Sequence, residues 1–556
     1  MRRTRAPVRS HILSFLCALS CLALSFGTTS CDDPSPSSAT VSTSSATVSS
    51  KEVKAPKGLM MVATARNAQA TWQKLLAAFG ARTKGWSPRV GGMVARSGVL
   101  PLTALTDLRE ESAAVAVVAR LSDQGPPTGV LALSLSSGRN LIMRLTRGAT
   151  ASWRTRDKGA VRFLEARDPI DGDLAMTRAV IADALVLAPD EATLLALGPY
   201  AAQRTYVSRA KKEDGAIEIV FADDWGSSIG PFIASLDSAT ALAALGGGVG
   251  SRLRSWLAQT RGGRARIGFE PRAIAIDLSM PARDSAVLRD WAKRPVVKLD
   301  TLNELPGDSA VVASWGETAE EGQALGQSRG KALARFFRIA VPSKAHRQLD
   351  RALSQIAKGS GPTQQLGLRC SGVGLTAYVR GDVRDAGALE SGWIAVTKRL
   401  LREPRARSYL RERELVLSSR KSRIETVLGT VWRLRLMPRP EARARREPID
   451  LLFHVTPRRY LIAAGMQPTA TLQQLDSPDE KASYDVAGFP LASSLPTSPW
   501  LLAHFDGDSF AACRDGSPAG RTRQSLALVL GQQHKSLAVK LRMDAALLSK
   551  WFAHLM

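Results

Sequence analysis

The stretch Ile274-Ala-Ile-Asp-Leu-Ser-Met280, followed after three residues by Asp284-Ser-Ala-Val-Leu-Arg-Asp-Trp291, has a second version near the end of the chain. There, Leu537-Ala-Val-Lys-Leu-Arg-Met543 continues directly into Asp544-Ala-Ala-Leu-Leu-Ser-Lys-Trp551. In both versions apolar and polar residues first alternate and then change to helical spacing. This pattern predicts the second strand of a hairpin, followed by a capped helix. Two such endings indicate a chain built from two related halves.

Shorter correspondences follow the same order along the chain. Pro56–Thr64 and Pro306–Ser314 align without a gap, and each is predicted as a buried strand. Asn67 is predicted to cap the helix that follows the first of these strands. Ala192–Leu197 and Ala470–Leu475 both come after an apolar strand and a nearby Pro, which is typical of a helix entrance. Several matches in one order favour an internal repeat over chance similarity.

The predicted fold is therefore α+β, with two related halves that arose by internal duplication. The halves span residues 58–294 and 305–554, and each is expected to contain an antiparallel sheet packed by helices. In the first half, Ala113–Arg120, Thr128–Ser136 and Asn140–Leu145 are predicted as successive strands separated by turns.

The N-terminus has the pattern of an export signal. Four arginines precede an apolar run, Ile12–Phe26, which is too short for a transmembrane helix and is typical of a signal peptide over residues 1–30. The following Gly27-Thr-Thr-Ser30-Cys31 resembles the lipobox of bacterial lipoprotein precursors. In that family the Cys becomes the first mature residue and carries lipid on its thiol, which implies lipidation of Cys31. The alternative is ordinary signal cleavage, with Cys31 as a plain thiol.

Residues 31–57 are rich in Ser, Thr and Pro and are predicted to be a disordered tether. The whole layout resembles uncharacterised bacterial envelope proteins of a domain-of-unknown-function family, whose repeated units open with a turn and a strand, as at Pro56 and Pro306. This resemblance implies an exported protein, periplasmic or on the cell surface, anchored to a bacterial membrane, and implies no known activity.

The chain is strongly basic. It has 76 Lys and Arg against 50 Asp and Glu, a formal net charge of +26. Such a charge favours anionic partners, but a general bias toward Ala, Arg and Gly is the preferred explanation of the charge by itself. The cations concentrate in insertions at Lys398–Arg423 and Pro438–Pro448.

The first insertion is predicted to be either a solvated helix face or a site for an anionic glycolipid or polysaccharide. The candidate anion-binding residues are Arg399, Arg402, Arg405, Arg407, Arg411 and Arg413. Nucleic acid is not expected as a partner, because the protein is predicted to be exported and no aromatic residues alternate with these arginines.

The sequence shows no convincing catalytic motif. It contains no Cys-x-x-Cys and no His-Glu-x-x-His, so no metal site and no cofactor is predicted. Cys370 and Cys513 are expected either to form a disulfide in an oxidising envelope or to be buried free thiols. The leading hypothesis is a lipid-anchored envelope protein that binds or scaffolds without catalysis. The alternative is an exported hydrolase, for which Ser328, Asp506 and Asp508 are the weak candidates.

Overall fold

The structure is a computed structural model. It describes residues 53–547 except 81–86, 97–100, 102–105, 123–126, 148–152, 167–175, 208–214, 224, 226–258, 324–333, 335–337, 372–373, 413–414, 424–429, 439–447, 466–467, 478–482, 508 and 510–524. The predicted signal peptide and Cys31 lie outside the described residues, as do Cys513, Ser328, Asp508 and Arg413.

The chain divides into two compact units. The first unit comprises Met1–Phe232 and Arg261–Leu278, and the second comprises Ile233–Thr260 and Ser279–Met556. The division predicted from the sequence, between residues 294 and 305, lies further along the chain than the end of the first unit at Leu278. The α+β class is confirmed, because the described strands form a large antiparallel sheet with helices packed on it. The expectation of two separate sheets is not met, since the described strands all belong to one open sheet.

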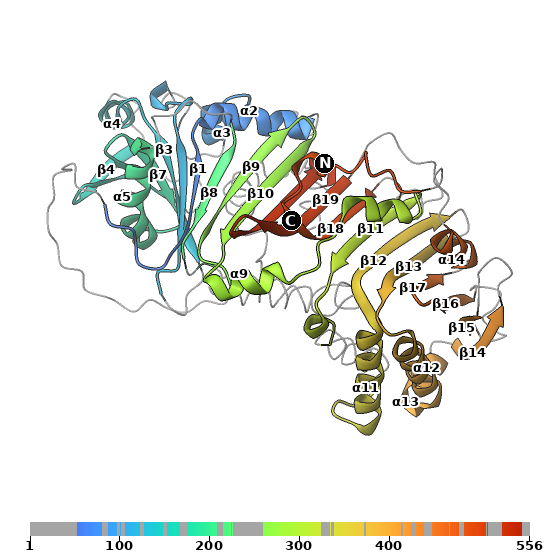
Figure 1. The fold of residues 1–556 in the computed structure, drawn as a ribbon. Helices are drawn as coiled ribbons and strands as arrows, with labels where there is room; N and C mark the ends of the chain where they lie inside the picture. The colour runs from blue at the N-terminus through green and yellow to red at the C-terminus, as the bar shows by residue number, and fades with distance from the viewer. Residues whose placement is uncertain are drawn as a thin grey trace, which may run out of the picture. The chain divides into compact units, whose positions relative to one another are not determined.

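The first unit contains a part of this sheet in which one strand near the middle, β1, pairs with both β2 and β8. The strand order is β4-β5-β6-β7-β3-β2-β1-β8-β9-β10, and the pairings from β4 to β9 are all antiparallel (Figure 1). The strands are β1 (Leu59–Ala65), β2 (Ala114–Ala119), β3 (Thr128–Ser134), β4 (Trp153–Lys158), β5 (Val161–Ala166), β6 (Thr177–Ile181), β7 (Ala184–Ala188), β8 (Ile217–Phe221), β9 (Gly263–Glu270) and β10 (Ala273–Pro281).

The second unit contains another part of the sheet, in which β11 pairs with both β12 and β18. Its strand order is β14-β15-β16-β17-β13-β12-β11-β18-β19-β20, again antiparallel throughout. The strands are β11 (Ser309–Gly316), β12 (Ser360–Ser371), β13 (Gly374–Val383), β14 (Leu415–Arg423), β15 (Thr430–Pro438), β16 (Ile449–Val455), β17 (Arg459–Gly465), β18 (Ser498–Asp506), β19 (Ser525–Gln533) and β20 (Ser536–Asp544).

The two parts of the sheet follow one order of pairing, strand for strand, and they agree in a detail of register. The β1–β2 pairing has an irregularity between Leu59 and Met61, and the β11–β12 pairing has one between Ser309 and Val311. These positions are the ones that the alignment of Pro56 with Pro306 makes equivalent. In both units the N–H at the first strand residue donates to the carbonyl of that Pro at 3.2 Å.

The predicted hairpin endings are confirmed. β9 and β10 are adjacent, and α9 (Ser285–Ala292) follows, with Asp284 accepting a hydrogen bond from the Val287 N–H at 2.9 Å. β19 and β20 form the second hairpin, and residues 545–547 begin a helix beyond which the chain lies outside the described residues. Trp291, only 1% exposed, packs edge-on against Trp500 at 5.8 Å between ring centroids. The helical register of this ending thus places its Trp in the core.

Helix α2 (Ala68–Phe79) also forms as predicted. The Asn67 side chain accepts from the Ala70 N–H, and Gly80 ends the helix with a positive φ of 56° that glycine adopts easily. Trp72 and Leu75 lie on its buried face.

One strand prediction is wrong. Asn140–Leu145 lies within a helix, α4 (Gly138–Thr146), and not in a strand. Ser137 accepts a hydrogen bond from the Asn140 N–H at 3.2 Å, and Leu141 and Leu145, four residues apart, are buried on one face. The cap and the helical spacing decide the conformation locally.

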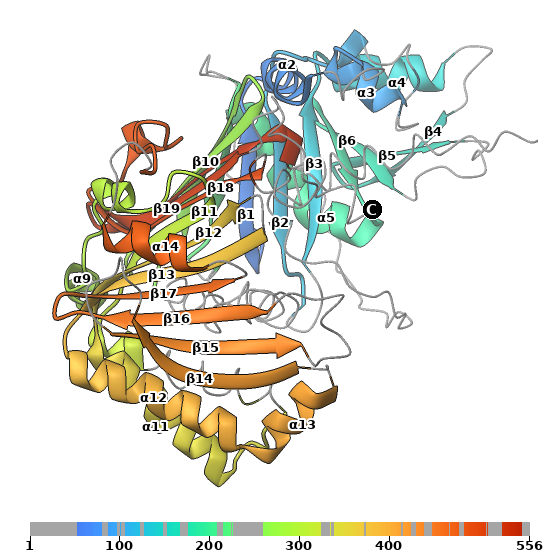
Figure 2. The same ribbon diagram turned by 90° about the vertical axis from the view of Figure 1, so that its right-hand side faces the viewer.

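Helices cover the sheet in different ways in the two units. In the first unit, α5 (Glu191–Val207) packs on the core formed by β2, β3, β5, β6 and β7, while α3 (Val90–Arg96) packs near α2. In the second unit, α14 (Pro468–Asp476) covers one face of the sheet. The other face carries α11 (Lys344–Gly359) and α12 (Ala386–Arg402), with α13 (Pro404–Glu412) beside the edge strand β14 (Figure 2).

Candidate anion-binding surface

The predicted basic insertion forms the end of α12, all of α13 and the edge strand β14. Asp385 caps α12 by accepting the Ala388 N–H at 3.0 Å, and Leu389, Val396 and Leu400 recur at helical spacing on its buried side. Pro404 then starts α13, where a missing N–H costs nothing. We call the exposed face of α12 and α13 the cationic surface.

The structure separates the predicted arginines into two groups. Arg399 is half-buried, and its guanidinium donates to the Glu403 carboxylate at 2.8 Å. Four others are exposed and have no carboxylate partner within the described part of the chain: Arg402, Arg405, Arg407 and Arg411. Arg399 therefore serves the fold, and the other four are available to a ligand.

The carboxylates near these arginines are already engaged. Glu403 is buried beside Arg399, and Glu412 pairs with Arg338 at 2.9 Å. The Arg338 guanidinium also lies over the Tyr409 ring, 5.4 Å from its centroid. The cationic surface therefore keeps an excess of positive charge, which attracts anions.

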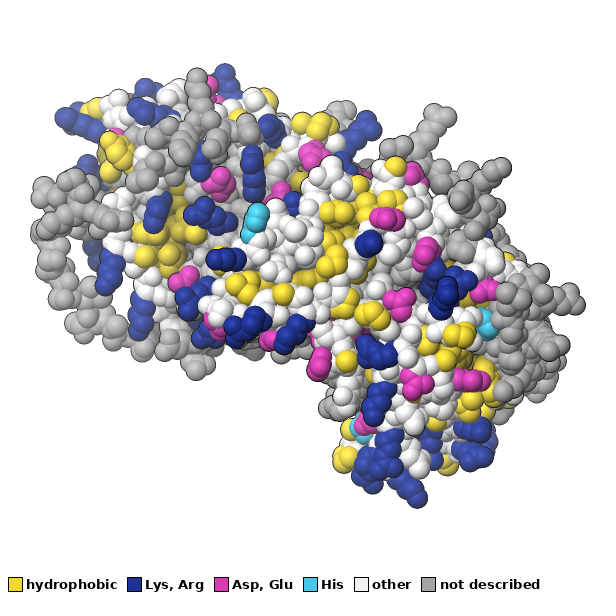
Figure 3. Space-filling model, viewed as in Figure 1, with side chains coloured by type: hydrophobic (Ala, Val, Ile, Leu, Met, Phe, Trp, Pro, Cys, Tyr) yellow, Lys and Arg dark blue, Asp and Glu magenta, His cyan; other side chains and the backbone are white. Residues whose placement is uncertain are grey.

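Neighbouring α11 adds exposed cations to the same end of the second unit. Lys344, Arg347, Arg351 and Lys358 are exposed on this helix. Figure 3 shows Lys and Arg side chains gathered where α11, α12 and α13 lie. Several like charges at one end of the unit add to its positive potential, and salt weakens that potential over about 8 Å at physiological ionic strength.

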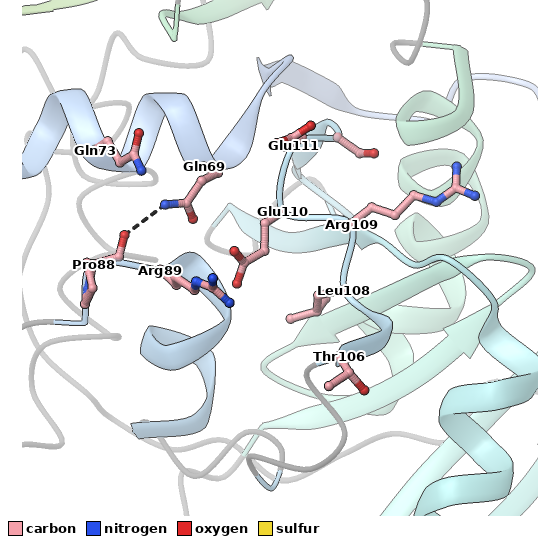
Figure 4. A pocket seen from close by; sticks show the side chains of 10 residues that line it. Gln69, Gln73, Pro88, Arg89, Thr106, Leu108, Arg109, Glu110 and Glu111 are labelled. Atoms are coloured by element: carbon pink, nitrogen blue, oxygen red, sulfur yellow. Dashed lines mark hydrogen bonds between the residues drawn. The ribbon is translucent and has the colours of Figure 1, made fainter.

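A second candidate is a cleft of about 710 Å³ in the first unit, where Gln69, Arg89 and Glu110 point inward (Figure 4). Two of its polar side chains, Gln69 and Glu110, bond to the protein's own backbone. The Gln69 amide donates to the Pro88 carbonyl at 2.9 Å and accepts from the Val90 N–H at 3.0 Å. The Glu110 carboxylate accepts from the Gly91 N–H at 3.2 Å. These contacts hold the first turn of α3, so the cleft is explained by folding.

The hydrolase candidates gain no support from the geometry. Asp506 is the last residue of β18, and its carboxylate accepts from the Ser509 N–H at 3.3 Å and from the Ser509 hydroxyl at 2.6 Å. This is the pattern of a turn or cap. Asp508 and Ser328 lie outside the described residues.

A polar pair that the sequence did not indicate lies near Asp506. The Tyr484 hydroxyl and the His504 Nδ1 are 2.6 Å apart, on the α14 side of the sheet. Burial lowers the pKa of His504, an effect that the Asp506 and Asp544 carboxylates oppose. Burial also raises the pKa of Tyr484. Both side chains are thus held neutral near pH 7, with no nucleophile beside them among the described residues, and this arrangement fits a buried structural hydrogen bond.

The described residues give no sign of a metal site or of a membrane-spanning helix. No group of three or more His, Cys, Asp and Glu side chains is placed to hold a metal ion in the described ranges. Within those same ranges, no helix combines the length and the apolar composition needed to cross a bilayer. Cys370 belongs to β12, and its proposed partner Cys513 lies outside the described residues, so their pairing stays a prediction.

Comparison with known proteins gives little. No protein-family model matches the chain, and no curated protein matches it. A solved structure titled "Structure of crystal form I of TP0453" is similar to 41% of this chain and 77% of its own, with 9% identity and a TM-score of 0.23. A similarity this weak carries no argument about fold or function.

Proposed function

We propose that this protein is a lipid-anchored envelope protein that binds an anionic glycolipid, lipid or polysaccharide on the cationic surface of its second unit, without catalysis. The observation that carries the proposal is the set of four exposed arginines on α12 and α13 that have no carboxylate partner among the described residues. On β4, by contrast, clustered cations pair with nearby acids.

The proposed architecture is an internal duplication that supplies two copies of one set of strands. The common strand order, the equivalent register irregularities at Leu59 and Ser309, and the repeated Pro turn all support it. In this proposal one copy was elaborated by the basic insertion. The binding surface therefore lies on the helices α12 and α13, around the basic insertion, and not on the shared sheet.

The proposed localisation, at a membrane of the cell envelope, depends on the N-terminal sequence. The apolar run and Cys31 support export followed by lipidation, and the Ser/Thr/Pro-rich tether gives the folded units freedom to reach a ligand near the membrane. Metabolic acyl labelling tests this localisation. The wild type is expected to take up label and the Cys31→Ser variant is not; equal label in both, or none in the wild type, contradicts it.

Binding is tested with the quadruple variant R402Q/R405Q/R407Q/R411Q on vesicles containing anionic phospholipid and on an acidic polysaccharide. Each Arg near an anionic surface contributes about 1 kcal/mol, so a loss of at least about a hundredfold in affinity is expected. Affinity of the wild type should fall steeply with salt.

The matched control is R139Q/R283Q/R289Q/R458Q, which removes the same charge from exposed arginines elsewhere. Only a small change is expected in this variant. An equal loss in both variants, or salt-independent binding, would show that net charge or another surface is responsible and would overturn the proposal.

A further inference from the structure

A crevice of about 50 Å³ lies between α12 and strands β14–β16, on the sheet face that carries α11 and α12. Its walls are mostly apolar and include two tryptophans. Trp393 and Thr397 come from α12, while Trp432, Leu434 and Leu451 come from the sheet. Trp393 also packs against Phe453, with ring centroids 5.1 Å apart. The crevice is therefore a small apolar opening beside the exposed cations of α12.

The two indole N–H groups at this crevice differ. The Trp432 N–H donates to the Glu390 carboxylate at 3.0 Å. The Trp393 N–H is buried and has no acceptor among the described residues. A buried donor without an acceptor is costly, and such a group in a native protein calls for an explanation. The ester carbonyl oxygen at the head of an acyl chain is an acceptor of the kind that this N–H lacks.

The mouth of the crevice is positively charged. Lys398 lines it and is exposed, and Arg402 follows one helical turn later on the same ridge of α12. The sheet adds an exposed apolar side chain on the same face, because Ile449 on β16 is 44% exposed and alternation places it on the side of Leu451, which lines the crevice. Apolar walls beside a cationic rim are complementary to a molecule that is apolar at one end and anionic at the other.

We propose that this crevice receives part of an acyl chain of an anionic phospholipid, while Lys398 and Arg402 hold its phosphate group. The inference rests on the proposed function and narrows its ligand to a membrane lipid. A volume of about 50 Å³ has room for only one or two groups the size of a water molecule, which each occupy about 30 Å³. A short length of chain therefore enters, and the remainder stays in the membrane.

Two neighbouring serines on β14 provide a matched test. Ser419 lines the crevice, and alternation along the strand directs Ser418 to the opposite face. Ser419→Leu fills the crevice without changing charge. Ser418→Leu adds the same side chain on the other face and serves as the control, with thermal denaturation of both variants to verify folding.

The probes are a short-chain phosphatidylglycerol below its micelle concentration, the same headgroup without acyl chains, and inorganic polyphosphate. The wild type is expected to bind the short-chain lipid about tenfold more tightly than the headgroup compound, since each buried CH₂ contributes favourably. Ser419→Leu should remove this difference and leave polyphosphate binding intact, whereas Ser418→Leu should retain the difference.

Each outcome separates the inference from the proposed function. If the wild type binds lipid and headgroup equally, or if Ser419→Leu keeps the preference for lipid, the crevice proposal is wrong while anion binding stands. If the wild type binds none of the three probes, the proposed function is wrong as well. As an independent readout, brominated acyl chains should quench tryptophan fluorescence less in Trp393→Phe than in the wild type, and equal quenching in the two would contradict insertion at Trp393.

Discussion

The two units use the same order of strands but treat their positive charges in opposite ways. On β4, at the edge of the sheet in the first unit, Arg154 and Arg156 pair with Glu165 at 2.9 and 2.8 Å, and Lys158 pairs with Glu191 at 3.2 Å. The Arg156 hydrogen bonds lower the pKa of both glutamates. The corresponding edge strand in the second unit, β14, is preceded instead by α12 and α13, whose exposed arginines lack such partners among the described residues.

The proposed function depends on this difference between paired and unpaired cations. Matched charges on β4 protect an open sheet edge, where unpaired backbone groups invite association with another strand. Unmatched charges on α12 and α13 contribute no comparable ion pairs and are free to meet an external anion. Variants in the two units test whether this difference in charge pairing produces a difference in anion binding and in stability.

The largest expected effect is on binding. Replacing Arg402, Arg405, Arg407 and Arg411 with Glu should abolish binding to anionic vesicles, because about 1 kcal/mol of attraction per cation is replaced by repulsion. Replacing Arg154, Arg156 and Lys158 with Gln should change vesicle binding by only about twofold, because these cations already pair with Glu165 and Glu191. Cosedimentation with vesicles measures both. A comparable loss in the β4 variant would contradict the claim that only the unpaired arginines of α12 and α13 bind the vesicles.

The next effect concerns a buried ion cluster in the second unit. Burial would raise the pKa of Asp450, but hydrogen bonds from Arg435 and Arg433 lower it from 3.8 to about 2. Because the folded-state pKa is below the unfolded value, this stabilisation is present above about pH 4 and is lost as the pH falls toward 2. Asp450→Asn should lower the free energy of unfolding at pH 7 by about 2 kcal/mol and flatten its dependence on pH in that window.

The matched variant in the first unit is Glu165→Gln. The Glu165 side chain is 30% exposed, against 5% for Asp450, so solvent screens its ion pairs more strongly. Its loss should therefore cost clearly less stability in urea denaturation than the loss of Asp450. Equal costs would show that burial does not distinguish the two clusters.

A complementary prediction is that the first unit gains anion binding when its cations lose their carboxylate partners. The double variant Glu165→Gln, Glu191→Gln releases Arg154, Arg156 and Lys158 from their partners. The first unit should then bind anionic vesicles about tenfold more tightly than before, when measured in a background that already lacks the α12 and α13 arginines. No gain would mean that exposed charge alone does not make a binding surface in this protein.

The smallest expected effect compares two helix caps. Ser137 caps α4 and Asp385 caps α12, helices that each follow the third strand of their unit. Replacement of either by Ala should cost about 1 kcal/mol of stability in thermal denaturation. Asp385→Ala should also weaken anion binding slightly, because α12 carries part of the cationic surface, whereas Ser137→Ala should leave binding unchanged.

Several of these features were readable from the sequence because they depend on residues close together. The hairpin and cap at Asp284, the strand after Pro306 and the helix capped by Asn67 all form as local pattern predicts. The strand predicted at Asn140–Leu145 is wrong for a local reason too. Ser137 caps a helix there, and Leu141 and Leu145 have helical spacing.

The candidate site was predictable only in outline. Sequence spacing identified Arg399 and Arg402 as members of one basic segment, but it could not distinguish them. Arg399 is occupied because folding brings it against Glu403 and into a half-buried position, while Arg402 remains exposed. The crevice at Trp393 was invisible in the sequence, because its walls come from α12 and from strands that lie more than twenty residues away.

The sequence alone therefore determined the alternation, the caps and the repeated order of pieces, because each depends on backbone preferences within a few residues. Only the tertiary structure decided which cations acquired carboxylate partners, which arginines stayed exposed without one among the described residues, and where apolar walls met a cationic rim. Those outcomes depend on distances between distant segments, and charge neutralisation and burial both follow from such distances.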